Sequence, residues 1–324
     1  MTTVHGAQSN RSSHDVLAVH SIDNVVFTVP DIEEAVKFYN AFGLHGVRDG
    51  NALDLYTVGH SHRWMRVIEN KQPKVLQFLS FGIYKKDEAA FKERIEKLGL
   101  ACAPHPLATQ EGLWLTGPDG HPFQLVVADK VSPHQKTPPA LKRGLARQDA
   151  AAPARSQIGK VHPRWLSHVL LFTPNVSGVV DFCEQVLGLR LSDRSGDLVA
   201  FMHTPHGSDH HLLACVKSEG PGLHHTSWDL GSVDEVGEGS EQMRNAGYAD
   251  GWGVGRHVLG SNYFYYVKDP WGSFAEYSAD IDFIAADQAW QAGDYAPEDS
   301  FYLWGPAVPD WFVINTELKA RSAT

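Results

Sequence analysis

Two histidines and one glutamate in the second half of the chain have the residue types and spacing of a metal site. His168, His225 and Glu276 each lie in a run with strand-forming character, in which alternate residues share one face. If the three strands line one concave sheet surface, two imidazoles and a carboxylate share a face, with coordination positions left open. This facial arrangement is typical of non-haem Fe(II) enzymes that handle O₂. A lone histidine on a strand is more often a hydrogen-bonded core residue, so the prediction depends on all three positions together.

A long-period internal repeat aligns these three positions with inert ones. Residues 22–31 (IDNVVFTVPD) resemble residues 166–175 (LSHVLLFTPN) at an offset of 144 residues, and each run ends at a turn that precedes an amphipathic helix. Residues 117–124 resemble residues 269–276 in the same way, as a hairpin turn followed by a return strand. The first-half counterparts of the three candidate ligands, in chain order, are Asn24, Phe78 and Gln124. The pattern therefore predicts a duplication in which only the second copy carries the chemistry.

Each copy also contains a second strand–helix cycle. Residues 78–83 and 225–230 are predicted strands, and predicted helices follow them over 88–98 and 232–246. We therefore predict an α+β fold of two domains, each built from two tandem βαβββ modules that form curved, mixed sheets. No Gly-rich phosphate loop follows a strand, so no nucleotide cofactor is expected.

Three stretches of the second half carry a resemblance to a known family: 166–172 (LSHVLLF), 222–228 (GLHHTSW) and 264–277 (FYYVKDPWGSFAEY). They resemble the type I extradiol, ring-cleaving catechol dioxygenases of the vicinal oxygen chelate superfamily. The resemblance covers about residues 20–290 and is weak in the first half. It implies the glyoxalase-like fold, a structural N-terminal domain, and an Fe(II) ion held by the three candidate ligands. Mn(II) is the alternative, because two imidazoles and a carboxylate accept it as readily. By strand alternation, His224 is expected to face the other side of the sheet.

The resemblance implies roles for further residues around the metal. His211, about fourteen residues before His225, matches the acid–base histidine, and His210 is the alternative because strand alternation turns only one of them to the site. His257 precedes Tyr266 by nine residues, and the two match the catalytic pair that binds the substrate oxygens. The implied reaction is extradiol (meta) cleavage of a catechol by O₂ to a 2-hydroxymuconic semialdehyde type product. An imidazole such as His211 can take and return a proton near neutral pH.

Leu170 is the candidate contact for the ring substituent of the substrate, because it lies two residues past His168 and should face the same side. An apolar residue there favours catechol, 3-methylcatechol or 2,3-dihydroxybiphenyl over an acidic catechol. Arg256 is the candidate cation for an acidic substrate, with an equal claim to a structural role. The aromatic residues of the C-terminal tail are predicted either to form a lid or to make a subunit contact: Trp290, Tyr295, Phe301, Tyr302, Trp304, Trp311 and Phe312.

Two other functions are compatible with the same scaffold. One is a metal-dependent isomerase or lyase of the superfamily, which would spread its ligands over both halves. The other is a non-catalytic small-molecule binding or resistance protein, which would have no use for His211, His257 and Tyr266 together. Ligands confined to one half favour the dioxygenase.

Composition narrows the class of protein further. The 324 residues include 28 Lys+Arg against 38 Asp+Glu, a net charge of −10, which disfavours nucleic acid as a partner. No run approaches the length of a membrane span, the start lacks an apolar signal core, and three scattered cysteines form no CxxC pair. We therefore expect a cytoplasmic protein with no membrane partner. As in similar proteins, a homo-oligomer is expected.

The expected domain organisation has five parts. These are an extension (1–19), a structural domain (20–129), a Pro/Lys/Arg-rich linker (130–164), a catalytic domain (165–283) and an aromatic tail (284–324). The linker carries eight Lys/Arg and one Asp, and we expect it to dock on the acidic body.

Overall fold

A computed structural model describes residues 2–3, 16–140, 154–286 and 288–318. The first half forms a seven-stranded sheet in the order β3-β4-β5-β2-β6-β8-β7. Helix α1 (Ile32–Phe42) follows β2, and α2 (Glu88–Lys97) follows β6. The strands are β2 (Ser21–Val29), β3 (His45–Asp49), β4 (Ala52–Tyr56), β5 (Arg63–Glu69), β6 (Val75–Ile83), β7 (Leu113–Thr116) and β8 (Pro122–Val127). The second module has two strands after its helix, with an isolated bridge between Ala101 and Leu115 beside them.

The second half forms the larger sheet, in the order β1-β19-β10-β11-β13-β9-β14-β17-β16-β15-β20. Its first module consists of β9 (Leu166–Thr173), α3 (Val176–Phe182), β10 (Arg190–Ser195), β11 (Val199–His203) and β13 (Leu213–Lys217). Its second module consists of β14 (Gly222–Leu230), α4 (Val233–Asn245), β15 (Gly251–His257), β16 (Tyr263–Lys268) and β17 (Phe274–Ala279). Three short strands extend it: β1 (Thr2–Thr3), β19 (Gly293–Asp294) and β20 (Tyr302–Trp304). Strands β12 (Ser208–Asp209) and β18 (Phe283–Ile284) pair as a separate two-stranded sheet, and helix α5 (Pro297–Ser300) precedes β20. The α+β fold of tandem modules is confirmed.

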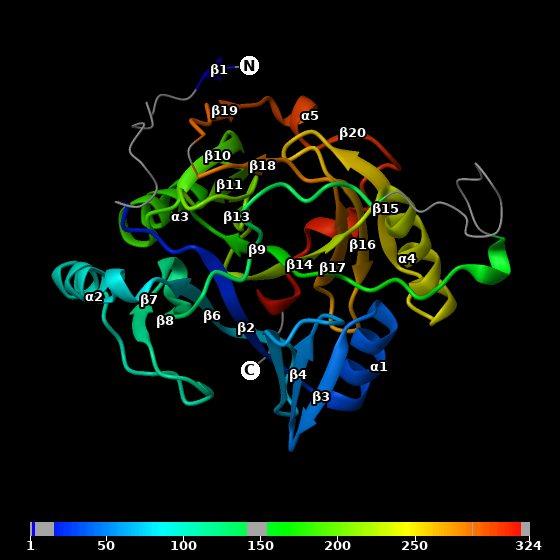
Figure 1. Ribbon diagram of the computed structural model, residues 1–324, viewed down its shortest axis with the longest axis horizontal. Helices are drawn as coiled ribbons and strands as arrows, with labels where there is room; N and C mark the ends of the chain where they lie inside the picture. The colour runs from blue at the N-terminus through cyan, green and yellow to red at the C-terminus, as the bar shows by residue number, and fades with distance from the viewer. Residues whose placement is uncertain (1, 4–15, 141–153, 287, 319–324) are drawn as a thin grey trace.

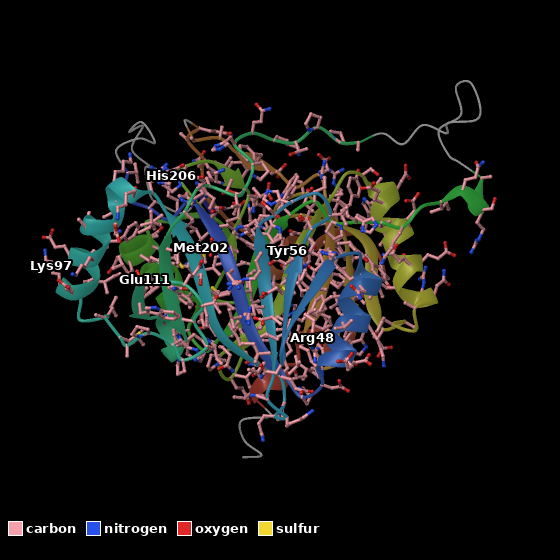
Figure 2. All side chains as sticks on the ribbon, turned by 60° about the horizontal axis from the view of Figure 1, so that its bottom comes forward. Arg48, Tyr56, Lys97, Glu111, Met202 and His206 are labelled. Carbon is pink, nitrogen blue, oxygen red and sulfur yellow. The ribbon has the colours of Figure 1, made fainter. Side chains whose placement is uncertain are left out.

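Local sequence explains where the helices begin and end. The Asp31 side chain accepts the N–H groups of Glu33 and Glu34 at the start of α1, and Ser232 accepts the N–H of Glu235 at the start of α4. Gly43 ends α1 in the left-handed conformation, at φ 98°. Helix α2 buries only one face, and Figure 2 shows Lys97 on its outer surface.

The pairing registers show that the three aligned positions are equivalent. In the second sheet, His168 pairs with Ser227 across β9 and β14, and Ser227 pairs with Glu276 across β14 and β17. His225 lies two residues before Ser227 on the same strand, so it shares their face. The matching row across β2, β6 and β8 consists of Asn24, Ser80 and Gln124, with Phe78 two residues before Ser80.

The two halves share one hydrophobic core. The rings of Phe42 and Tyr277 stack with centroids 4.0 Å apart, and the Tyr277 hydroxyl donates to the Phe42 carbonyl at 2.7 Å. Lys74 and Asp269 form a buried ion pair across the same boundary. Figure 1 shows α1 of the blue first half beneath the yellow α4 of the second. The first sheet therefore supports the second through side-chain packing.

The described parts of the linker contact acidic groups on the body. Lys136 pairs with Asp280 at 2.8 Å, and Arg164 Nε donates to Asp229 at 2.5 Å. Linker residues 141–153 lie outside the described residues. Within the part of the chain that the structure describes, no helix is both long enough and apolar enough to cross a membrane.

Candidate metal centre and active site

His168, His225 and Glu276 meet at the centre of the second sheet. The Nε2 atoms of His168 and His225 lie 3.2 and 3.5 Å from the same carboxylate oxygen, Glu276 Oε2. Three strands supply them (β9, β14 and β17), and all three side chains are buried. Among the described residues, these three form the one group of histidine, cysteine and acidic side chains close enough to hold a metal ion.

The donor atoms themselves indicate a cation. His225 Nε2 and Glu276 Oε2 are buried without a hydrogen-bond partner, an arrangement that costs free energy unless something neutralises their lone pairs. Burial disfavours the ionised form of Glu276, but the neighbouring imidazole of His168, and then that of His257, outweigh it and lower the pKa of the carboxyl. Ligands at right angles around an ion with bonds of about 2.1 Å stand about 3 Å apart, close to the observed spacing. The residues therefore fit a divalent ion.

The outer nitrogen, Nδ1, of each candidate ligand imidazole contacts a neighbouring side chain. His168 Nδ1 lies 3.3 Å from the Ser167 hydroxyl, which itself donates to Asp209 Oδ2 at 2.7 Å. His225 Nδ1 lies 2.7 Å from His224 Nδ1. These contacts place the N–H of each ring at Nδ1 and leave the Nε2 lone pair facing Glu276, the arrangement that outer contacts of metal-binding histidines usually produce.

The orientation expected for His224 is wrong. The register shifts between Leu223 and His225, where β14 has a β-bulge against β9, and a bulge breaks the alternation of side chains. His224 therefore lies on the site's face, where its ring contacts Phe172 and Phe274. Its Nε2 donates to the backbone carbonyl of Phe312 at 3.0 Å.

His257 and Tyr266 form the expected pair beside Glu276. The Tyr266 hydroxyl donates to His257 Nε2 at 2.9 Å, while His257 Nδ1 donates to the Phe301 carbonyl at 2.8 Å. Burial, and then the charge of Glu276, raise the pKa of the Tyr266 phenol well above its usual range, so it remains a hydrogen-bond donor. Burial also lowers the pKa of His257. Two backbone carbonyls of the tail thus orient two site imidazoles.

The structure distinguishes the two candidate acid–base histidines by position. His211 lines the cavity, with its ring centroid 4.1 Å from that of His168. His210 lies behind it, with Nε2 2.8 Å from Asp193 Oδ2. Burial lowers the pKa of His211 well below its ordinary value, with the charges of the neighbouring imidazoles acting in the same direction. His211 is therefore the histidine that faces the space beside the ligands.

A cavity of about 310 Å³ opens from these residues. Leu170 lines it, as expected from its spacing, together with Phe172, Phe201 and the tail residues Phe301 and Phe312. The tail therefore covers the site. Arg256 lies outside the lining, where it donates to the Ser261 carbonyl at 2.9 Å and to the Tyr263 hydroxyl at 3.1 Å.

Among the described residues of the first half, the positions equivalent to the candidate ligands form no such group. Phe78 lies in an apolar cluster, where its ring contacts that of Trp114 with centroids 5.0 Å apart. Gln124 accepts a hydrogen bond from the Ser80 hydroxyl at 2.7 Å and donates to the Gln110 carbonyl at 2.8 Å. Packing thus fills the space that the ligands occupy in the second half.

Comparisons with known proteins agree with this geometry. Residues 165–277 match the model of the Glyoxalase/Bleomycin resistance protein/Dioxygenase superfamily. The chain is 51% identical over 301 residues to Metapyrocatechase 2 of Cupriavidus necator, covering 93% of each protein. The chain belongs to the extradiol catechol dioxygenases.

More distant relatives extend the similarity. The chain is 23% identical to the manganese-dependent 2,3-dihydroxybiphenyl 1,2-dioxygenase of Geobacillus genomosp. 3, with 76% of this chain and 80% of that protein covered. Its fold matches the crystal structure of homoprotocatechuate 2,3-dioxygenase from Arthrobacter globiformis at a TM-score of 0.73 and 18% identity, covering 92% of each chain. This dioxygenase thus shares its architecture with a structure of low sequence identity.

Three contributors to the site of this dioxygenase carried no sequence signal. Asn262 donates to Glu276 Oε1 at 3.1 Å and to the Ser278 hydroxyl at 2.9 Å, but it comes from the loop before β16. His224 was assigned to the wrong face because a bulge is not visible as a pattern. Asp193 comes from β10, seventeen residues before His210 in the chain, and only folding brings it behind the site.

Proposed function

We propose that this dioxygenase cleaves an apolar-substituted catechol beside the diol with O₂, giving a 2-hydroxymuconic semialdehyde type product. Fe(II) is the proposed ion, with Mn(II) as the second metal that the donors accept, and His168, His225 and Glu276 are its proposed ligands. The observation that carries the proposal is the pair of partnerless buried donor atoms, His225 Nε2 and Glu276 Oε2, at the floor of an apolar cavity. The equivalent first-half positions hold Asn24, Phe78 and Gln124, which offer no imidazole or carboxylate, and this supports the proposal over an isomerase with ligands in both halves.

The protein's own residues supply binding, orientation and proton transfer. When bound, the metal supplies Lewis acidity and a common template for the catechol oxygens and O₂. His257 and Tyr266 stand next to Glu276 and hydrogen-bond the substrate oxygens. His211, which lines the cavity next to His168, takes a proton and returns it as the ring opens. The tail residues Phe301 and Phe312 exclude water from the cavity.

The cavity wall supports an apolar ring substituent. Leu170, Phe172 and Phe201 form the wall near the ligands, where an apolar group gains free energy by leaving water. Lys217 also lines the cavity, but Asp197 pairs with it at 3.0 Å and both groups are about half exposed. The proposed substrates are catechol, 3-methylcatechol and 2,3-dihydroxybiphenyl.

A homo-oligomer is also proposed. Leu303 and Trp304 on β20 are 65% and 46% exposed, and β20 is an edge of the large sheet. Exposed apolar groups on a sheet edge favour contact with another chain. Light scattering of the purified protein measures the molar mass, and a monomer would contradict this part of the proposal.

The decisive experiment loads the purified protein with Fe(II) anaerobically and then adds a catechol in air. We expect O₂ uptake and a yellow ring-fission product, and metal analysis compares Fe(II) with Mn(II) loading. Absence of O₂ uptake across a panel of mono- and bicyclic catechols would refute the proposed reaction.

A further inference from the structure

The buried carboxylate of Asp193 and the imidazole of His210 lie behind His211, connected to it by hydrogen bonds. Asp193 Oδ2 lies 2.8 Å from His210 Nε2, and His210 Nδ1 lies 3.0 Å from His211 Nδ1. His210 is fully buried and Asp193 is 4% exposed. Neither residue lines the cavity, whereas His211 does. The first two residues can therefore act on a bound substrate only through the third.

The direction of each hydrogen bond follows from the chemistry of the groups. An ionised carboxylate only accepts, so His210 Nε2 must carry the proton that Asp193 receives. A neutral imidazole with its proton on Nε2 accepts at Nδ1. His211 Nδ1 must then be the donor to His210, which leaves His211 Nε2 with a free lone pair. The same ordering of tautomers by a buried aspartate operates in serine-protease triads.

Backbone and side-chain groups hold Asp193 and His210 in place. Asp193 Oδ1 accepts the N–H of Gly293 at 2.7 Å, so the carboxylate cannot rotate freely. The backbone N–H of His210 donates to the Asp282 carbonyl at 2.6 Å, and the Ser192 hydroxyl donates to the His210 carbonyl at 2.5 Å. A Cβ added at Gly260 would stand 3.4 Å from an atom of each imidazole ring, so Gly260 lies directly beside both.

We propose that Asp193 and His210 are positioning residues that hold His211 as its Nδ1–H tautomer, with Nε2 free to accept a proton from a bound catechol hydroxyl. The proton then leaves from Nε2 when the ring opens. The catalytic use of the tautomer depends on the proposed function, whereas the tautomer itself does not. The two can therefore be tested separately.

The first test is Asp193→Asn. The Gly293 N–H requires an acceptor, so the amide oxygen stays there and the amide NH₂ faces His210 Nε2 as a donor. His210 then carries its proton on Nδ1, and His211 is turned to the Nε2–H tautomer. We expect kcat to fall about 10²- to 10⁴-fold at unchanged iron content, with a catechol KM within about threefold of wild type.

The matched control is Asp294→Asn. Asp294 also accepts a backbone N–H, from Gly196 at 2.8 Å, but it does not belong to the hydrogen-bonded series Asp193–His210–His211. This variant should leave kcat and KM unchanged. A kcat for Asp193→Asn within about threefold of wild type overturns the proposal, and so does an equal loss in the control.

The second test reads the tautomer directly in the wild-type protein and uses a variant only to assign the signal. Long-range ¹H–¹⁵N spectra of histidine-labelled protein, metal-free and Zn(II)-loaded, report which ring nitrogen carries the proton, and His211→Asn assigns the signal. We expect His211 to be protonated on Nδ1 alone and His210 on Nε2 alone. A proton on His211 Nε2, or protons on both nitrogens of His210, overturns the proposal. If the wild type cleaves no catechol but shows these tautomers, the proposed function fails and the positioning inference stands.

Discussion

The contact of His224 with a proposed ligand yields a sharp prediction about metal affinity. His224 accepts from His225 Nδ1 and donates to the Phe312 carbonyl. In His224→Phe both hydrogen bonds are lost while the ring shape is kept. The surrounding rings of Phe172, Phe274 and Phe312 stand 4.8–5.2 Å from the imidazole centroid, so an apolar ring is sterically compatible.

The expected magnitude follows from the two groups left without partners. Each buried donor or acceptor without a partner costs about 1–3 kcal/mol, and loss of an outer contact to a ligand histidine weakens metal binding about 10- to 100-fold. We therefore expect the dissociation constant for Fe(II) to rise within that range. The Phe312 segment should also pack less tightly over the cavity and raise the KM for the catechol.

The assay is anaerobic competition for Fe(II) with a chromogenic chelator. His224→Gln is the matched variant, because its amide oxygen can accept from His225 and its NH₂ can donate to Phe312. We expect this variant to recover most of the affinity. Wild-type affinity in His224→Phe, or an equal loss in both variants, would refute the reasoning that the hydrogen bonds orient His225.

Further outcomes are expected for the site and for stability. His211→Phe should retain iron but lower kcat about 10²- to 10⁴-fold, and unchanged turnover would contradict its acid–base role. Leu170→Phe should lower kcat/KM for 3-substituted catechols about 10-fold more than for catechol, as measured by O₂ uptake; equal effects would remove Leu170 from the substituent wall. Removal of the metal by a chelator should abolish activity, and Fe(II) should restore it; activity that persists without metal would contradict a metal centre. Burial, then the charges of His210 and Arg190, lower the pKa of His203 to about 3, below its ordinary 6.5 in the unfolded chain. His203 therefore favours the folded state above pH 6.5, and that contribution is lost as the pH falls towards 3. His203→Gln should reduce the slope of unfolding free energy against pH by about 1.4 kcal/mol per pH unit, measured by urea denaturation from pH 4.5 to 6.5, and an unchanged slope would contradict this.

Patterns local in the sequence predicted most of the elements and the equivalence of the two copies. The helix expected over 232–246 is α4 at Val233–Asn245 with its two caps, because a serine start and an apolar periodicity are local features. The equivalence of Asn24 with His168 follows from the repeat and appears again in the pairing registers. The positions of Leu170 and His211 beside His168 agree with expectation because strand alternation holds on β9 and near β13.

Where alternation is interrupted, prediction from sequence is wrong. The bulge at His224 depends on how β14 registers against β9, and neither strand encodes that register alone. The sequence also left open whether the tail covers the site or makes a subunit contact. The structure places Phe301 and Phe312 of the tail in the cavity wall.

The sequence by itself therefore determined the duplication, the family, and the three side chains that differ between the copies, because these depend on residue type and local periodicity. Only the tertiary structure decided which nitrogen of each imidazole faces the site. That choice depends on partners distant in the chain: Phe312 for His224, Phe301 for His257 and Asp193 for His210. A hydrogen bond has a direction only when both groups are in place, and these groups meet only when the tail packs on the second half and β10 packs beside His210.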